Sequence, residues 1–192
     1  MTTARTPMTS RPVLRSDDAF LAEPIHEETP RHTAYRFTLA LTRLSIAWVF
    51  VWAFLDKTFG WGHETLSKAA WINGGSPTKG FLSHASTGPF ASFYKDIAGA
   101  TWADWLFMAA LAGIGIALTL GITMRIAAAA GATLLVMMWT AVLPPANNPF
   151  MDDHLIYATV LVLLALTAAG KTLGLGRKWE RIPIVSRHGF LK

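Results

Sequence analysis

The chain has 192 residues, of which 52% are hydrophobic and 15% are charged, and it carries a net charge of +5. Soluble globular domains average about 25% charged residues, so this composition favours a membrane protein. The sequence has no cysteine, which excludes disulfides, thiolate metal sites and cysteine-ligated iron–sulfur clusters. The basic residues gather toward the two ends instead of alternating with aromatic residues along a stripe, so nucleic acid is not expected as a partner.

The apolar segments define the predicted domains. Residues 1–36 are polar and rich in Pro, Thr and Arg, which predicts a disordered tail. Four apolar segments follow at about 37–56, 102–122, 124–143 and 150–171, and a membrane-spanning helix needs roughly 17–25 such residues. A basic tail covers residues 176–192. The sequence therefore predicts an all-α integral membrane protein in the lipid bilayer, with a four-transmembrane-helix bundle over residues 37–175.

Short-range signals support these helix limits. Thr101 and Asp104 have the spacing of a capping box before the second span. Asn148–Pro149 has the pattern of an N-cap and a first-turn proline before the fourth span. Arg43 interrupts the first span, and we expect it to reach the interface or to bond a neighbouring helix end. A ridge of small residues in the second span predicts close helix packing; it consists of Ala109, Gly113, Ala117 and Gly121.

The distribution of basic residues predicts the orientation of the spans. Lys and Arg lie before the first span, at Arg125 between the second and third, and after the fourth, whereas residues 144–153 have none. Cytoplasmic connections carry the excess of positive residues, and an even number of spans places both termini on one side. We therefore expect both tails in the cytoplasm and the first and third connections on the outer face.

The first connection, about residues 58–100, is far longer than a usual loop. Ser76–Pro77 and Gly88–Pro89 each have the pattern of a helix start, and Glu64–Trp71 has the composition of another short helix. Apolar residues with helical spacing follow the second start, at Phe90, Phe93, Tyr94 and Ile97. We expect short interfacial or re-entrant helices that form an outer lid over the bundle.

Seven of the eight tryptophans fall in the outer half of the predicted bundle or in its lid. One interpretation is an aromatic belt at the membrane interface. The other is a pocket for a flat ligand such as a quinone headgroup, for which Trp52, Trp71 and Trp139 are the candidate contacts. The seven residues are Trp48, Trp52, Trp61, Trp71, Trp102, Trp105 and Trp139.

Ionisable residues at the span ends are the candidate catalytic groups. Asp56 and Lys57 close the first span, Asp153 and His154 open the fourth, and Tyr157 follows Asp153 by one helical turn. An ionisable group at membrane depth has a partner or a function. The alternative is structural, since acids at a helix N-terminus are favoured by its dipole. Neighbouring ligands on a helix point in different directions, so neither a metal nor haem is expected here.

A small-residue stretch in the first connection is a candidate anion site. Free backbone N–H groups beside a lysine suit a small oxyanion, although such a stretch is also typical of an ordinary turn. The candidate substrate-binding residues are Gly74, Gly75, Ser76, Thr78 and Lys79.

Three segments, Arg43–Lys57, Trp71–Gly80 and Asn148–Tyr157, resemble the DoxX/DoxD family of small bacterial and archaeal membrane proteins. The resemblance covers about residues 37–179 and implies a four-helix bundle in the cytoplasmic membrane. The DoxD branch is the membrane subunit of a thiosulfate:quinone oxidoreductase that acts with a second small subunit.

The resemblance therefore implies a membrane subunit of a quinone-linked oxidoreductase, which oxidises a reduced sulphur compound such as thiosulfate at the outer face. Quinone and a second protein subunit, or a larger redox complex, are the implied partners. The alternative is a non-catalytic membrane anchor or assembly scaffold for such a complex. A small transporter fits least, because the last three spans have no charge in their middles.

Overall fold

A computed structural model describes residues 30–192, and this part of the chain is all-helical. Its four long helices are α1 (Pro30–Phe59), α4 (Thr101–Leu120), α5 (Met124–Ala141) and α6 (Asp153–Leu166). Three of them, α1, α4 and α5, are long and apolar enough to cross a membrane, and α6 is apolar but shorter. The described residues thus confirm the predicted all-α fold and contain three candidate membrane-spanning helices.

The limits predicted for the first and fourth spans differ from the structure, in which α1 ends at Phe59 and α6 ends at Leu166. Helix α1 begins at Pro30, so residues 30–36 of the predicted tail are helical; the rest of that tail lies outside the described residues. Helix α6 begins at Asp153, not near residue 150, because the Asp152 side chain accepts a hydrogen bond from the Leu155 N–H and caps it. Asn148 instead accepts from the N–H groups of Phe150 and Met151, which closes a separate turn.

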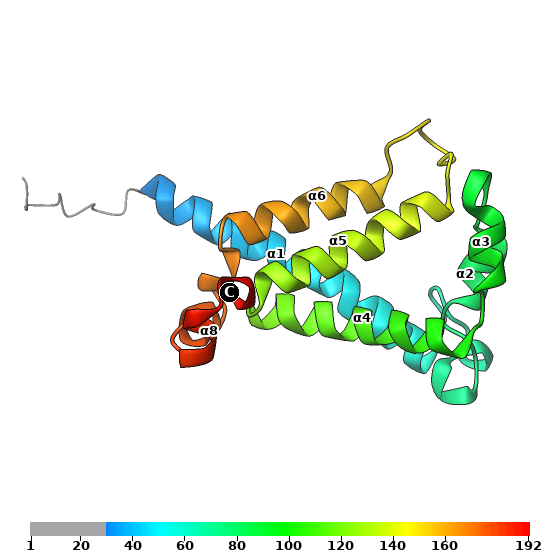
Figure 1. The fold of residues 1–192 in the computed structure, drawn as a ribbon, viewed down its shortest axis with the longest axis horizontal. Helices are drawn as coiled ribbons and strands as arrows, with labels where there is room; N and C mark the ends of the chain where they lie inside the picture. Colours follow the sequence, from blue (N-terminus) through cyan, green and yellow to red (C-terminus); the bar gives the residue numbers. More distant parts are fainter. Residues whose placement is uncertain (1–29) are drawn as a thin grey trace, which may run out of the picture.

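The four helices run side by side along the length of the molecule (Figure 1). The closest pairs are α1 with α4 and α5 with α6. Helix α1 begins at the same end at which the C-terminal segment lies, here called the terminal end. The long connection between α1 and α4 lies at the opposite end, here called the lid end. Toward the lid end, α5 and α6 lean away from α4 in this view.

The lid, residues 60–100, is built from short helices, as expected. They are η1 (Ser67–Ala69), η2 (Trp71–Asn73), α2 (Lys79–His84), η3 (Gly88–Phe90) and α3 (Ala91–Asp96). In place of the helix predicted over Glu64–Trp71, the chain forms separate 3-10 turns. The lid also joins the end of α5, since the Thr87 N–H donates to the Ala141 carbonyl at 2.9 Å.

Helix packing matches the predicted small-residue ridge only at its end, where a Cβ on Gly121 would lie 2.7 Å from a carbonyl oxygen that follows α6. Gly113 has open space where a Cβ would project, and Ala109 is exposed. The close approach of α4 to α1 occurs instead at Gly115, where a Cβ would lie 2.8 Å from Cγ2 of Val51. The contact face of α4 is therefore rotated from the predicted one, because the bulky core residues of this helix share the face of Gly115.

Arg43 joins the elements at the terminal end. Its side chain is fully buried, and its guanidinium donates to the carbonyls of Leu118, Thr119, Thr172 and Leu173. These acceptors include the Leu118 and Thr119 carbonyls in the last turn of α4, and the Leu118 carbonyl also accepts from the Gly121 N–H. The guanidinium thus adds hydrogen bonds at a helix end, where carbonyls lack a full set of intrahelical partners. Arg43 thus bonds a neighbouring helix end, one of the two expected roles.

The predicted C-terminal tail is folded. It contains α7 (Gly176–Trp179), α8 (Pro183–Arg187) and η5 (Gly189–Leu191). The Trp179 Nε1–H donates to the Leu191 carbonyl at 2.7 Å, and the Arg125 N–H donates to the Lys192 carbonyl at 3.1 Å. The segment is therefore a cap on the terminal end.

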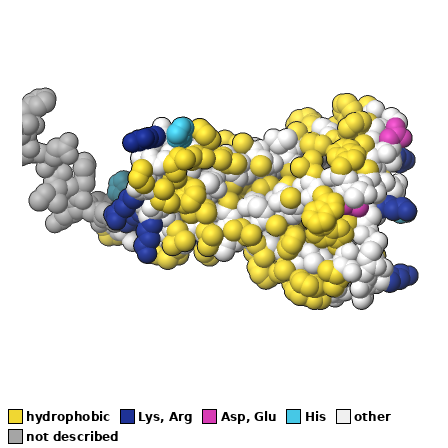
Figure 2. Space-filling model, turned by 60° about the horizontal axis from the view of Figure 1, so that its bottom comes forward, with side chains coloured by type: hydrophobic (Ala, Val, Ile, Leu, Met, Phe, Trp, Pro, Cys, Tyr) yellow, Lys and Arg dark blue, Asp and Glu magenta, His cyan; other side chains and the backbone are white. Residues whose placement is uncertain are grey.

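The surface has the pattern expected for lipid contact. Figure 2 shows Lys and Arg side chains at the two ends and a broad zone of hydrophobic side chains between them. Large apolar side chains lie on the outside of the bundle, including Leu41 and Leu106, each 64% exposed. A soluble protein rarely exposes so continuous an apolar surface, whereas lipid tails would cover it.

Candidate functional site: a cavity beneath the lid

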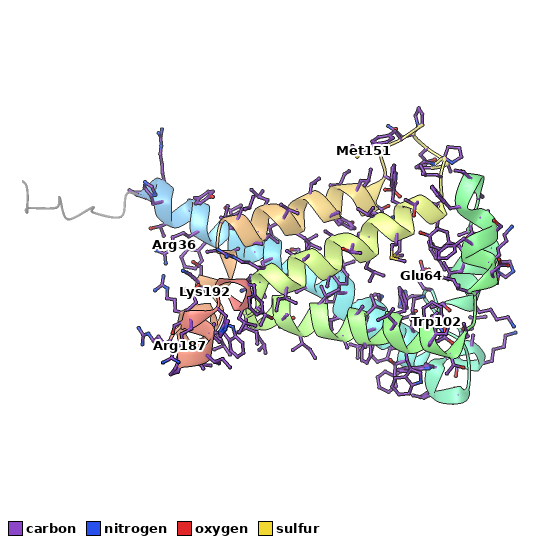
Figure 3. All side chains as sticks on the ribbon, viewed as in Figure 1. Arg36, Glu64, Trp102, Met151, Arg187 and Lys192 are labelled. Atoms are coloured by element: carbon purple, nitrogen blue, oxygen red, sulfur yellow. The ribbon has the colours of Figure 1, made fainter. Side chains whose placement is uncertain are left out.

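A cavity of about 1190 Å³ lies between the four long helices at the lid end, with the lid over it. Its walls include α1 at Trp48–Lys57, α4 at Phe107 and Leu111, and the first turns of α6. Figure 3 marks the lid end by Glu64, Trp102 and Met151, and the terminal end by Arg36, Arg187 and Lys192. The cavity is thus formed by segments as far apart in the sequence as Trp48 and Tyr157.

All five candidate catalytic residues line this cavity. Asp56 and Lys57 reach it from the end of α1, and Asp153, His154 and Tyr157 reach it from the start of α6. The packing of the bundle therefore brings together two groups that the sequence placed only at span ends.

Asp56 is buried at the cavity wall, with 1% of its surface exposed. Its Oδ2 atom accepts hydrogen bonds from the N–H groups of Glu64 at 3.1 Å and Thr65 at 2.8 Å. Its Oδ1 atom has no hydrogen-bond partner. One oxygen therefore fixes the start of the lid to α1, and the other is a buried acceptor that a bound ligand can satisfy.

Lys57 lies beside Asp56 and is half-buried. Its Nζ atom lies 6.0 Å from the centre of the Phe107 ring, a distance at which the ring face attracts a cation. Within residues 30–192, no carboxylate pairs with this ammonium group. Its three N–H donors are available to a ligand in the cavity.

His154 is oriented by the acids that precede it. Its Nδ1 atom lies 2.7 Å from Oδ2 of Asp152 and 3.5 Å from Oδ1 of Asp153. An ionised carboxylate only accepts hydrogen bonds, so Nδ1 carries the proton of the pair. The Nε2 atom of the neutral ring is then left as a proton acceptor. The Tyr157 hydroxyl, on the next turn, has no hydrogen-bond partner in the described part of the chain.

Asp152, Asp153 and His154 form a group of possible metal ligands in the described residues. One ligand atom from each lies within 4.8 Å of the others. The Asp152 carboxylate is already used, since Oδ1 caps α6 and Oδ2 holds the His154 ring. The geometry is therefore explained by helix capping and ring orientation without a metal.

The small-residue stretch holds the lid in place, and its backbone is largely occupied. Oδ1 of the buried Asp104 accepts from the Ser76 hydroxyl at 2.8 Å, the Thr78 N–H at 3.0 Å and the Thr78 hydroxyl at 2.6 Å. A Cβ on Gly75 would collide with the Ala69 carbonyl, and the left-handed Gly74 ends η2.

This arrangement changes the predicted anion site. Of its five residues, Ser76 and Lys79 line the cavity, whereas Gly74, Gly75 and Thr78 do not. The Lys79 N–H donates to the Ser76 hydroxyl at 3.2 Å. The Thr78 and Lys79 amides, predicted to bind an anion, thus bond within the protein, and the Lys79 side chain is the one cationic group of this stretch that lines the cavity.

The tryptophans divide between the two predicted roles. Trp52 lines the cavity and packs against Trp48, Trp61 and His63. Trp71 packs edge-on against Trp105 with ring centres 4.7 Å apart and lies outside the cavity lining. Trp139 also lies outside it and donates to the Phe150 carbonyl at 2.7 Å.

Sequence reasoning missed two groups. Asp104 was assigned to a capping box, but α4 has Ala100 as its N-cap with no side-chain bond, and the carboxylate holds the lid instead. Trp48 and Val49 line the cavity and are also exposed on the outer surface, at 59% and 42%. An acid at the start of a membrane span was a signal for Asp104. Trp48 was one of the seven outer tryptophans but was not chosen as a candidate contact, and no local pattern marked Val49.

Comparison of the chain with family models, curated proteins and solved structures gives no match. The cavity is therefore interpreted from its own residues.

Proposed function

We propose that the protein is a four-helix membrane protein in which α6 completes the bundle, and that it acts as the membrane subunit of a quinone-linked oxidoreductase. Its substrate at the lid end would be a reduced sulphur compound such as thiosulfate. The terminal end, which carries Arg125 and the basic cap, would face the cytoplasm of a bacterium or archaeon.

The observation that carries this proposal is that one cavity connects the lipid-facing surface of the bundle with the lid. At one side it is lined by Trp48 and Val49, which are exposed where lipid would lie. At the other it is lined by the lid residues Lys79 and His84. The titratable groups of α1 and α6 lie in the same cavity. This arrangement suits a reaction between a lipid-soluble compound and a water-soluble anion.

The cavity residues fit a quinone. The Tyr157 hydroxyl and the Lys57 ammonium have no acceptor in the described protein, so both are available to carbonyl oxygens of the ring. The unpaired Oδ1 of Asp56 is an acceptor for the hydroxyl of the reduced form. Trp52 offers a flat apolar wall. A bound quinone supplies the capacity to accept two electrons with two protons.

His154 is placed to handle those protons. Asp152 fixes its ring, so Nε2 exchanges a proton while Nδ1 stays bonded to the carboxylate. Lys79 would hold the anion by charge. Two thiosulfate ions release two electrons when a sulfur–sulfur bond joins them, which balances the reduction of one quinone. The chain has no cysteine to carry electrons, so we also propose a second protein subunit as partner.

The test uses membranes of the source organism in which the chain is replaced by variants, so that any partner subunit is present. Thiosulfate-dependent reduction of a short-chain quinone is followed by its absorbance. We expect His154→Ala to lower the rate at least about 100-fold, the usual contribution of a general acid–base group. Lys79→Ala should raise the half-saturating thiosulfate concentration.

Lys95→Ala is the matched control for Lys79→Ala, because Lys95 is an exposed lid lysine outside the cavity lining. Unchanged rates in both cavity variants would contradict the proposal. A chain that binds no quinone and purifies with a stoichiometric redox partner would instead be the membrane anchor of a larger complex.

A further inference from the structure

A second, smaller cavity lies at the terminal end, remote from the lid. Its volume is about 210 Å³, and it opens between the start of α5, the end of α6 and the C-terminal cap. The basic residues Arg125, Lys171 and Lys192 line it, and Glu180 is the one acid in its lining. Among the described residues the cavity therefore has a surplus of two positive charges.

The basic groups are only partly used by the protein. Lys171 Nζ pairs with Glu180 Oε2 at 2.9 Å. Arg125 donates one bond from Nη1 to the Gly189 carbonyl at 3.0 Å, and a guanidinium has five N–H donors. The Lys192 ammonium pairs with no acid in residues 30–192. Most of the donors around the cavity are thus available to an anion.

The cavity adjoins the apolar outer face of the bundle. Leu166 lines it and is 80% exposed, and Leu163, one turn earlier on α6, is 50% exposed. Apolar residues of the cap, Leu173 and Leu175, are also exposed at this end. A ligand with a charged head and apolar chains would meet both kinds of surface at once.

We infer that this cavity binds the headgroup of an anionic phospholipid, with the phosphate among the three basic residues and an acyl chain along Leu163 and Leu166. Basic cavities between helices at the cytoplasmic side of membrane proteins suit such headgroups. A free phosphate has the same kind of charge but no acyl chain to pack against the exposed leucines of α6. An anionic phospholipid would contact both the basic residues and the leucines.

The experiment titrates the purified full-length chain in detergent with phosphatidylglycerol, phosphatidylcholine or inorganic phosphate. Bound lipid is counted by native mass spectrometry. We expect one phosphatidylglycerol to bind in preference to phosphatidylcholine, and phosphate alone to bind far more weakly. Arg125→Gln and Lys192→Gln should each weaken phosphatidylglycerol binding about fivefold, the factor given by about 1 kcal/mol per cation near a membrane surface.

Two further variants separate this site from general effects. Glu180→Gln removes the only acid of the lining and frees Lys171, so binding should strengthen about fivefold, a gain that misfolding would not produce. Arg177→Gln removes an exposed cation of the same end that does not line the cavity, and it should leave binding unchanged.

Three results would overturn the inference. They are equal binding of the two lipids, an Arg177→Gln loss as large as that of Lys192→Gln, and phosphate binding as tight as that of phosphatidylglycerol. None of these results bears on the quinone cavity, which lies at the other end of the bundle.

Discussion

The attachment of the lid through one carboxylate oxygen leads to a quantitative prediction. Asp104 is 7% exposed, and its Oδ1 atom accepts all three bonds from Ser76 and Thr78. Bonds to a charged group contribute about 1.5–3 kcal/mol each. The two bonds from buried Thr78 therefore stabilise the closed lid by about 3–6 kcal/mol, and Asp104→Ala should remove this contribution.

Hydrogen exchange followed by mass spectrometry measures this loss directly. Local opening sets the exchange rate of a protected amide, and every 1.4 kcal/mol is a factor of ten. Asp104→Ala should accelerate exchange of the Thr78 amide at least about 100-fold. Asp104→Asn keeps an acceptor oxygen but loses the charge, so a loss of about 1.5 kcal/mol should give about tenfold.

The control is Asp96→Ala, which removes an exposed acid of α3 in the same lid. It should leave the exchange of Thr78 unchanged. The reasoning would be refuted if Asp104→Ala left the protection of residues 76–84 intact, or if Asp96→Ala exposed them equally.

Two further predictions concern the bundle. Gly115→Ala should lower the unfolding free energy in detergent by about 1–3 kcal/mol, because the new Cβ would lie 3.2 Å from the Val51 backbone nitrogen. Gly113→Ala on the same helix has open space and should be neutral or stabilising by up to about 1 kcal/mol; equal losses in both would contradict the packing. Arg43→Met should cost at least about 3 kcal/mol, since it removes four hydrogen bonds from a charged donor group, and Arg43→Lys should recover part of this in thermal unfolding. A melting temperature unchanged by Arg43→Met would contradict the proposed role.

The sequence predicted α4 and α5 well because their apolar runs are continuous. Hydropathy reports composition over a whole turn or more, so the ends of α4 and α5 were placed within two residues. Hydropathy does not indicate which side chain will cap the end of a helix. The sequence offered both Asn148 and Asp152 as caps. The Asp152 side chain caps α6, whereas the Asn148 side chain closes a separate turn, so α6 starts later than Asn148–Pro149 indicated.

The residues of the candidate site were predictable where ionisable side chains lie at the end of a predicted span. Asp56 and His154 were identified as ionisable groups at membrane depth, and both line the cavity. The glycine-rich loop was not predictable in the same way, because the acceptor for its amides, Asp104, lies 26 residues from Thr78. The sequence also could not show that Trp71 and Trp139 lie outside the cavity lining, since no local pattern distinguishes them from Trp52.

The length of α6 has a consequence for the membrane itself. Its 14 residues rise about 21 Å at 1.5 Å per residue, whereas the hydrocarbon core of a bilayer is about 30 Å thick. Tilting α6 would shorten its span further. In the proposed four-span bundle, the bilayer beside α6 would therefore thin locally, with a cost that grows with each ångström of hydrophobic mismatch. Such thinning would bring water closer to Asp152 and His154, which begin this helix.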